Sequence, residues 1–283
     1  MPVPELCEAL ADHSDVHLRT EEPMHRHTPL RVGGPAQAWI HVDTHDALLA
    51  VLRCCRKERI PWRIHWPFSD WLVRDGGIKG VVIRPGSGFE GVRHDEEGSH
   101  IGAATPWAAL GGPESPSARW PMARWPGSVG GLFDRGAQSV LEGRCIRLKW
   151  LAGRGVETIE VSPAAPLPEI PRTAVLLEMT LRPPLPRIVS SHRSPPSPGS
   201  VFFSPDGDDP HALVSRAQLR GTRLRSWRLS PVSPATLVQL GGGSCRDALL
   251  LARGIQTQVL KHRGVRLEVG IPVVGAEPGR RDP

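Results

Sequence analysis

The sequence predicts an α+β fold built from two or three small domains. The chain has 283 residues, which is enough for that many separate hydrophobic cores. Amphipathic helical patterns alternate with short β-rich runs, so helices and strands are expected to mix along the chain. Glycine and proline number 30 each, which indicates many turns between short elements.

The N-terminal part predicts a strand, a helix and further strands. A helix is expected over residues 43–59, because Leu48, Leu52 and Cys55 fall on one face of that segment. Pro61 ends it, since the residue before a proline disfavours the helical conformation. Short β-rich runs follow at residues 63–66, 80–84 and 100–103.

The C-terminal part predicts a third unit after a proline-rich connection at residues 183–198. Helices are expected at residues 210–219 and 246–263, and Ser244 begins a capping-box-like Ser-x-x-Asp before the second. A strand over residues 265–274 follows. Further β-rich runs lie before the connection, at residues 144–151, 156–161 and 173–181.

Composition limits the classes of protein. No apolar run approaches the ~20 residues that a membrane span needs, and the N-terminus has no apolar core of a secretory signal. Five cysteines without CxxC spacing fit neither a metal site nor a disulfide framework, so a cytoplasmic location without bound metal is expected.

The formal net charge of +6 leaves two interpretations open. Clustered cations would indicate a polyanion partner, whereas scattered cations indicate a solvated basic surface. The arginines are spread along the chain, so nucleic-acid binding is not favoured. A modest positive field would equally suit a nucleotide-sugar ligand.

Glycine-containing motifs occur along most of the chain. Residues 27–36 read HTPLRVGGPA, 72–84 read LVRDGGIKGVVIR, 125–131 read WPGSVGG, 197–205 read SPGSVFFSP, and 264–268 read GVRLE. In this order, and beside these elements, they resemble the motifs of the UDP-N-acetylenolpyruvoylglucosamine reductase (MurB) family. One such motif alone would be weak, but five in sequence favour a common fold.

The resemblance implies a VAO/PCMH-type FAD-binding fold of two α/β subdomains plus a C-terminal substrate domain. The subdomains would cover residues 1–90 and 91–186, and the substrate domain residues 187–283. It also implies FAD, NADPH as hydride donor, and an enolpyruvyl ether of UDP-N-acetylglucosamine as substrate, in peptidoglycan precursor synthesis. A UDP-sugar is thus the implied small-molecule partner; no protein partner follows from the sequence.

The motifs also imply site residues. Ser200 matches the family's catalytic acid. The implied cofactor-binding positions are Gly33, Gly34, Ser69, Asp75, Gly127, Ser128, Gly130 and Gly131.

The family's FAD phosphate loop reads Gly-x-Gly-Ser-Asn, whereas residues 65–70 read HWPFSD. Glycines let backbone N–H groups close on the phosphates. Here Pro67 has no N–H, Trp66 and Phe68 add bulk, and Asp70 replaces a neutral amide with an anion. The turn after Gly131 also departs, with Asp134 in place of the family's asparagine. These changes predict that FAD is not bound.

The catalytic set departs as well. The family's Tyr-Arg-x-Ser segment has no match, and the chain contains no tyrosine. The catalytic glutamate maps to Gly270, and Glu268 would alternate to the opposite side of a strand. Arg172 could substitute for the missing arginine only from a different position.

The sequence therefore favours a catalytically silent member of the family over two alternatives. One alternative is an active FAD/NADPH-dependent reductase with a rebuilt site, in which His65, Arg74 and Arg135 contact phosphate. The other is a basic nucleotide or nucleic-acid binding protein, which only the net charge supports.

Overall fold

The structure is a computed structural model, and it describes most of the chain. The described residues are 6, 10, 15–111, 127–134, 141–152, 155–162, 164–182, 200–204 and 208–279. The chain divides into two compact units. Unit 1 comprises Met1–Glu22, Ala36–Ser69 and Lys79–Val189, and unit 2 comprises Pro23–Pro35, Asp70–Ile78 and Ser190–Pro283.

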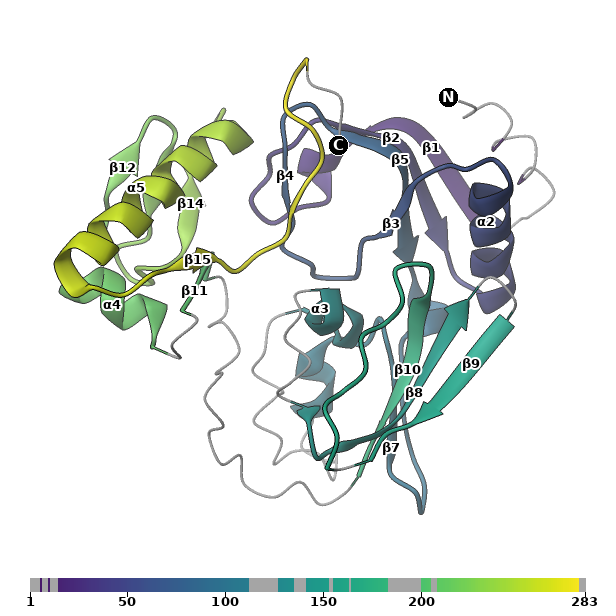
Figure 1. Cartoon of the computed structure of the whole chain (residues 1–283). Coiled ribbons are helices and arrows are strands. Elements are labelled where there is room, and N and C mark those ends of the chain that lie inside the picture. The colour runs from purple at the N-terminus through teal and green to yellow at the C-terminus, as the bar shows by residue number, and fades with distance from the viewer. Residues whose placement is uncertain are drawn as a thin grey trace. The chain divides into compact units, whose positions relative to one another are not determined.

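The first sheet of unit 1 has four strands and is covered by one long helix. In spatial order the strands are β1 (Val16–Pro23), β2 (Pro35–Val42), β5 (Ile78–Pro85) and β3 (Trp62–Ile64). Strand β3 runs parallel to β5. Helix α2 (His45–Lys57) lies beside this sheet in Figure 1, and Thr44 caps its N-terminus by accepting from the amide of Ala47. The apolar face predicted for this helix is buried.

The second sheet of unit 1 has five antiparallel strands. Their order is β6 (Val92–His94), β7 (Ser99–Gly102), β10 (Val175–Leu181), β8 (Cys145–Ala152) and β9 (Gly155–Glu160). The short helix α3 (Val129–Asp134) and the 3-10 turns η2 (Ser87–Phe89) and η3 (Trp107–Gly111) complete this unit. One buried hydrophobic cluster joins residues of both sheets, which explains why they form a single unit.

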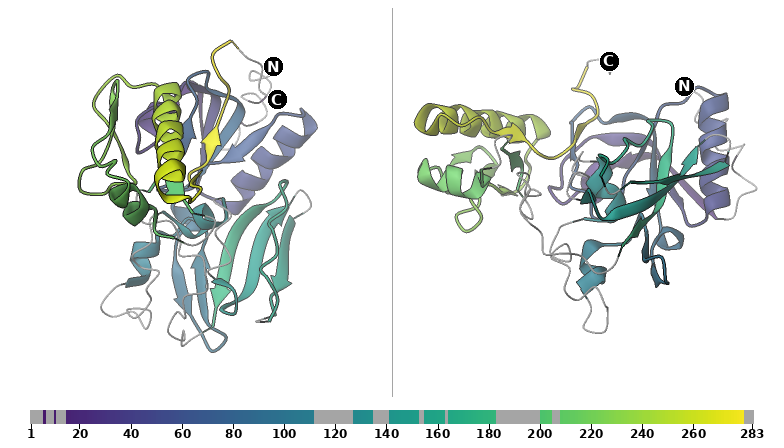
Figure 2. Two further views of the ribbon diagram at one scale, coloured as in Figure 1. Left: turned by 60° about the vertical axis from the view of Figure 1, so that its left-hand side comes forward. Right: turned by 60° about the horizontal axis from the view of Figure 1, so that its bottom comes forward.

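Unit 2 packs two helices against short strands. Its elements are η1 (Met24–Arg26), β4 (Leu72–Val73), β11 (Phe202–Phe203), α4 (Pro210–Arg216), β12 (Arg223–Leu224), β13 (Trp227–Leu229), β14 (Leu237–Gln239), α5 (Cys245–Arg263), β15 (Glu268–Val269) and β16 (Val273–Val274). Helix α5 lies along the strands β12 to β14 in both views of Figure 2. Trp227, Leu251 and Ile255 belong to the core of this unit.

Helix α5 begins and ends where the sequence indicates. Ser244 accepts from the amide of Asp247 at the N-terminus, and Gly264 ends the helix in the left-handed conformation with φ of 69°. In contrast, α4 is shorter than expected, because it ends at Arg216 and Gln218 has φ of 59°.

The single strand expected over residues 265–274 is wrong. Two separate two-residue strands occur instead, β15 paired with β11 and β16 paired with β4. Gly270 and Pro272 lie between them, and proline cannot donate to a β ladder.

The predicted boundary near residue 90 falls inside unit 1, between its two sheets. The boundary at residue 186 stays a prediction, and the proline-rich connection at 183–198 lies outside the described residues.

Candidate functional site

Gly33 and Gly34 lie against the loop that follows β4. A Cβ at Gly33 would lie 2.5 Å from the Cβ of Val73, and one at Gly34 would lie 2.3 Å from the carbonyl oxygen of Asp75. Gly33 also has φ of 123°, which favours glycine. Close packing within unit 2 therefore accounts for both glycines; their assignment to a cofactor stays a prediction.

Asp75 caps helix α5. Its Oδ1 accepts from the amide of Cys245 at 2.8 Å, and its Oδ2 accepts from the amide of Arg246 at 3.1 Å. A carboxylate at a helix N-terminus satisfies amides that have no partner within the helix and interacts favourably with the helix dipole. Both carboxylate oxygens thus have a structural role, which sequence reasoning missed because the helix begins 170 residues later.

The proposed phosphate loop forms a tight turn. The amide of Ser69 donates to the carbonyl of Trp66 at 3.1 Å, which closes a four-residue turn. Proline at the second position and φ of 58° at Phe68 in the third position correspond to a type II turn. The backbone thus keeps a left-handed residue at a position where the family has glycine.

The two bulky side chains of this loop lie in different environments. Trp66 is 5% exposed and belongs to the hydrophobic core of unit 1, whereas Phe68 is 60% exposed. Steric obstruction of the loop by these two residues stays a prediction. Pro67 has no backbone N–H and remains a difference from the family's phosphate loop.

Gly130 is needed by the packing of Trp66. A Cβ at Gly130 would lie 2.4 Å from atoms of the indole ring. The amide of Gly130 is also occupied, since it donates to the carbonyl of Ala103 at 2.7 Å. Gly130 therefore has a packing role in this chain.

Two buried hydroxyls meet at Gly131. A Cβ at Gly131 would lie 3.4 Å from Ser69 Oγ and 3.5 Å from Ser128 Oγ, so both oxygens face one small region. Ser69 is 6% and Ser128 0% exposed, and neither hydroxyl has a hydrogen-bond partner in the described part of the chain. A buried hydroxyl without a partner costs free energy that a ligand's oxygen atoms would offset.

Gly127 and Arg84 flank this region of unit 1. Gly127 has φ of 85°, and a Cβ there would lie 3.6 Å from the carbonyl oxygen of Phe68. The Arg84 guanidinium donates to the carbonyl of Trp66 at 3.1 Å and lies 3.3 Å from Nδ1 of His65. Burial lowers the pKa of Arg84 below its usual value. Sequence reasoning missed Arg84, although it ends a β-rich run beside the loop.

Of the other two arginines considered for phosphate contact, the structure describes only Arg74. Arg74 forms an ion pair with Glu277 within unit 2. Arg135 lies outside the described residues.

The loop residues fit a phosphate-bearing cofactor such as the FAD that the family implies. The observation that decides this is the pair of buried, unpartnered hydroxyls on Ser69 and Ser128, which face a glycine. Ser69, Ser128 and the backbone around Gly131 would hold its diphosphate.

The hydroxyl of Ser200 is hydrogen-bonded to the backbone of Phe202, the first residue of β11. Its hydroxyl donates to the carbonyl of Phe202 at 2.9 Å and accepts from the amide of Phe202 at 3.2 Å, and the residue is 1% exposed. This local pattern competes with any role for the hydroxyl as an acid. Ser200 as a catalytic acid stays a prediction.

The position that matches the family's glutamate lies close to Ser200 in the structure. The amide of Gly270 donates to the carbonyl of Val201 at 2.9 Å, and a Cβ at Gly270 would lie 3.0 Å from the Cβ of Phe203. Glu268 is exposed on β15, and Arg172 is exposed in unit 1. The scaffold thus brings the two catalytic positions together, but without a carboxylate at the second.

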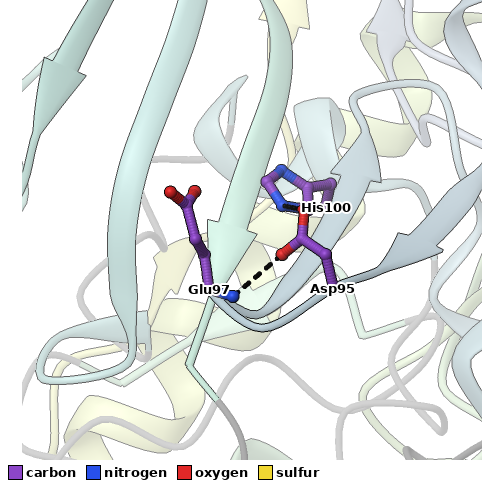
Figure 3. Close-up of side chains that lie close together, drawn as sticks. All are labelled: Asp95, Glu97 and His100. Carbon is purple, nitrogen blue, oxygen red and sulfur yellow. Dashed lines mark hydrogen bonds and ion pairs between the residues drawn. The ribbon is translucent and has the colours of Figure 1, made fainter.

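A cluster of potential metal ligands lies at the turn between β6 and β7. Ligand atoms of Asp95, Glu97 and His100 lie within 4.8 Å of one another (Figure 3). However, Arg93 donates to Asp95 and Arg147 donates to Glu97, so both carboxylates already have cationic partners. We interpret the cluster as an ion-pair network.

His100 connects this network to the centre of the second sheet. Its Nε2 lies 2.8 Å from Oδ2 of Asp95, and its Nδ1 lies 3.5 Å from Oε1 of Glu178 on β10. Glu178 also accepts from Lys149 at 2.9 Å. The imidazole is 3% exposed, so the network ties a buried side chain to the surface turn.

None of the helices in the described residues is long and apolar enough to cross a membrane.

The two sheets of unit 1 and the helices and short strands of unit 2 form an α+β fold of the VAO/PCMH type with an added domain. The family model described as "UDP-N-acetylenolpyruvoylglucosamine reductase, C-terminal domain" matches residues 190–274. The UDP-N-acetylenolpyruvoylglucosamine reductase of Anaeromyxobacter sp. (strain Fw109-5) is 30% identical over 288 residues, which is 90% of this chain and 88% of the relative. The chain belongs to the UDP-N-acetylenolpyruvoylglucosamine reductase family.

Two further similarities agree. The reductase of Rubrobacter xylanophilus is 30% identical over 290 residues, covering 90% of this chain and 94% of the relative. The crystal structure of UDP-N-acetylenolpyruvylglucosamine reductase (MurB) from Thermus caldophilus matches with a TM-score of 0.63 at 20% identity, covering 91% of this chain and 98% of that chain. The fold class predicted from the sequence is confirmed.

Proposed function

We propose that this chain is a catalytically silent reductase homologue that keeps a cradle for the FAD diphosphate. The loss of activity is inferred from two residues of unit 2. The hydroxyl of Ser200 is hydrogen-bonded to Phe202, and Gly270 has no carboxylate. The observation that carries the cradle is the pair of unpartnered hydroxyls on Ser69 and Ser128.

The reaction of the family requires groups that the described residues Ser200 and Gly270 do not supply. Reduction of an enolpyruvyl ether generates an enolate, which needs a cation to stabilise it and an acid to protonate it. The hydroxyl of Ser200 donates a hydrogen bond to the carbonyl of Phe202, and residue 270 has no side chain to assist it. Loss of one such group costs a factor of about 10² to 10⁴ in rate, so their combined loss leaves little activity.

The cofactor half of the site is better preserved than the catalytic half. Ser69 and Ser128 would donate to the phosphates, and bound FAD would supply hydride transfer. The substrate class that we propose for unit 2 is a UDP-sugar, since the relatives are named for one. Retention of the hydroxyl pair also favours a second candidate function, an active FAD/NADPH-dependent reductase with a rebuilt site.

Complementation of a bacterial strain depleted of its own reductase tests the proposal. We expect no growth with this chain, although the protein accumulates and retains flavin absorbance after incubation with FAD and removal of the free cofactor by desalting. Robust growth would favour the active reductase instead. Absence of flavin binding would remove the cradle but leave the prediction of inactivity standing.

A further inference from the structure

Phe68 occupies a conformation that phenylalanine rarely adopts. Its φ is 58°, and in a type II turn this position normally carries glycine because a Cβ is strained there. Glycine would relieve that strain, so the phenylalanine adds a local cost to the folded state.

Packing does not compensate for this cost. The chain has five phenylalanines, all described, and Phe68 is the only exposed one, with 60% of its surface accessible to solvent. By comparison, Phe89 is 2% and Phe202 0% exposed. A strained, exposed aromatic ring stabilises the fold little, and strain of this kind concentrates at ligand-binding positions.

Phe68 borders the hydroxyl pair. The next residue is Ser69, whose hydroxyl is buried and unpartnered, and the carbonyl oxygen of Phe68 would lie 3.6 Å from a Cβ at Gly127. Gly127 in turn precedes Ser128, the second hydroxyl. The ring therefore belongs to a residue that lies beside both hydroxyls.

We infer that Phe68 is a stacking contact for the planar heterocycle of the nucleotide whose phosphates Ser69 and Ser128 hold. A nucleotide combines phosphates with a flat ring, and an exposed phenyl group beside a phosphate cradle complements both parts. This inference rests on the proposed cradle. Phe68 would thus contact the ring of the ligand, at a position where the family motif has glycine.

Three variants separate the ring from the backbone. Phe68→Gly removes both the ring and the strain, Phe68→Asn keeps a residue that tolerates the left-handed conformation but lacks a ring, and Phe68→Tyr keeps an aromatic face. Binding of FAD is measured by titration calorimetry and by quenching of flavin fluorescence, and thermal unfolding is measured without ligand. ADP and flavin mononucleotide, titrated separately, distinguish adenine from flavin as the stacked ring.

We expect Phe68→Gly and Phe68→Asn to weaken FAD binding by about 5- to 150-fold, and Phe68→Tyr to bind like the wild type. Without ligand, Phe68→Gly should melt at the same temperature as the wild type or higher. Unchanged binding in both variants, or weakening in Phe68→Gly alone, overturns the stacking role. A wild-type protein that binds none of the three nucleotides overturns the cradle as well, and Ser69→Ala with Ser128→Ala should abolish binding if the cradle holds.

Discussion

Gly130 and Trp66 depend on each other, because a Cβ at residue 130 would lie 2.4 Å from the indole ring. We expect Gly130→Ala to lower the free energy of unfolding by about 1–3 kcal/mol, since the core around the indole must shift. Gly131→Ala is the matched control, because its Cβ would lie 3.4 Å from the nearest atom. Equal losses in both variants, measured by denaturant unfolding, would contradict the proposed packing role.

Restoring the family's glycine at residue 66 should harm the protein. Trp66 is part of the hydrophobic core of unit 1. Removal of a buried tryptophan side chain costs about 3–5 kcal/mol, so Trp66→Gly should yield little folded protein. Circular dichroism and the soluble yield measure this, with Phe68→Gly as the control from the same loop. A stable Trp66→Gly variant would show that the indole adds little to the core.

Asp75 should contribute to stability through helix α5. Asp75→Ala leaves the amides of Cys245 and Arg246 without their carboxylate, and we expect a loss of about 0.5–2 kcal/mol in denaturant unfolding. Ser244→Ala removes the second cap of the same helix and is the comparison. If Asp75→Ala instead abolished FAD binding without loss of stability, the family-based assignment of Asp75 to the cofactor would be favoured.

Ser200 should be a structural residue. Its hydroxyl is satisfied by Phe202, so Ser200→Ala should cost about 1 kcal/mol of stability. Nucleotide binding should not change, and neither should complementation, which we expect to be absent in both proteins. Growth that depends on Ser200 would establish it as a catalytic residue.

Glu178 predicts a pH-dependent contribution to stability. Burial alone raises the pKa of this carboxyl group, but Lys149 and His100 outweigh burial, so the pKa lies below its usual value of 4.5. A carboxyl group whose pKa is lowered on folding stabilises the protein at pH values above its unfolded-state pKa. This stabilisation is lost as the pH falls through the folded-state pKa. Glu178→Gln should therefore be less stable than the wild type at pH 7, with a smaller difference near pH 3. A difference that does not change with pH, measured by urea unfolding, would rule out this linkage.

The sequence predicted those features that depend on local pattern. The helix expected over residues 246–263 and its cap at Ser244 follow from short-range rules, and the structure has both. The ordered motifs predicted the fold because they record a whole family's architecture. The broken strand after Leu267 was missed because its two halves pair with different segments, β11 and β4.

The candidate site was harder to predict, because residue type does not reveal where a side chain points. Trp66 and Phe68 are both bulky aromatic residues of one loop, but one is 5% and the other 60% exposed. Asp75 matched a family motif, but its partner is a helix terminus that only tertiary structure brings near. The hydrogen bonds of Ser200 to Phe202 likewise depend on the local backbone conformation.

The parallel pairing of β4 with β16 also bears on synthesis of the chain. Leu72 and Val73 cannot find their partners until Val273 and Val274 have left the ribosome, and Arg74 waits for Glu277, which lies 203 residues further along. Unit 2 therefore cannot finish folding during most of translation, whereas the strands of unit 1 end at Leu181. The edge of β4 that pairs with β16 must stay unpaired through that interval, and we expect this part of the nascent protein to depend most on chaperones.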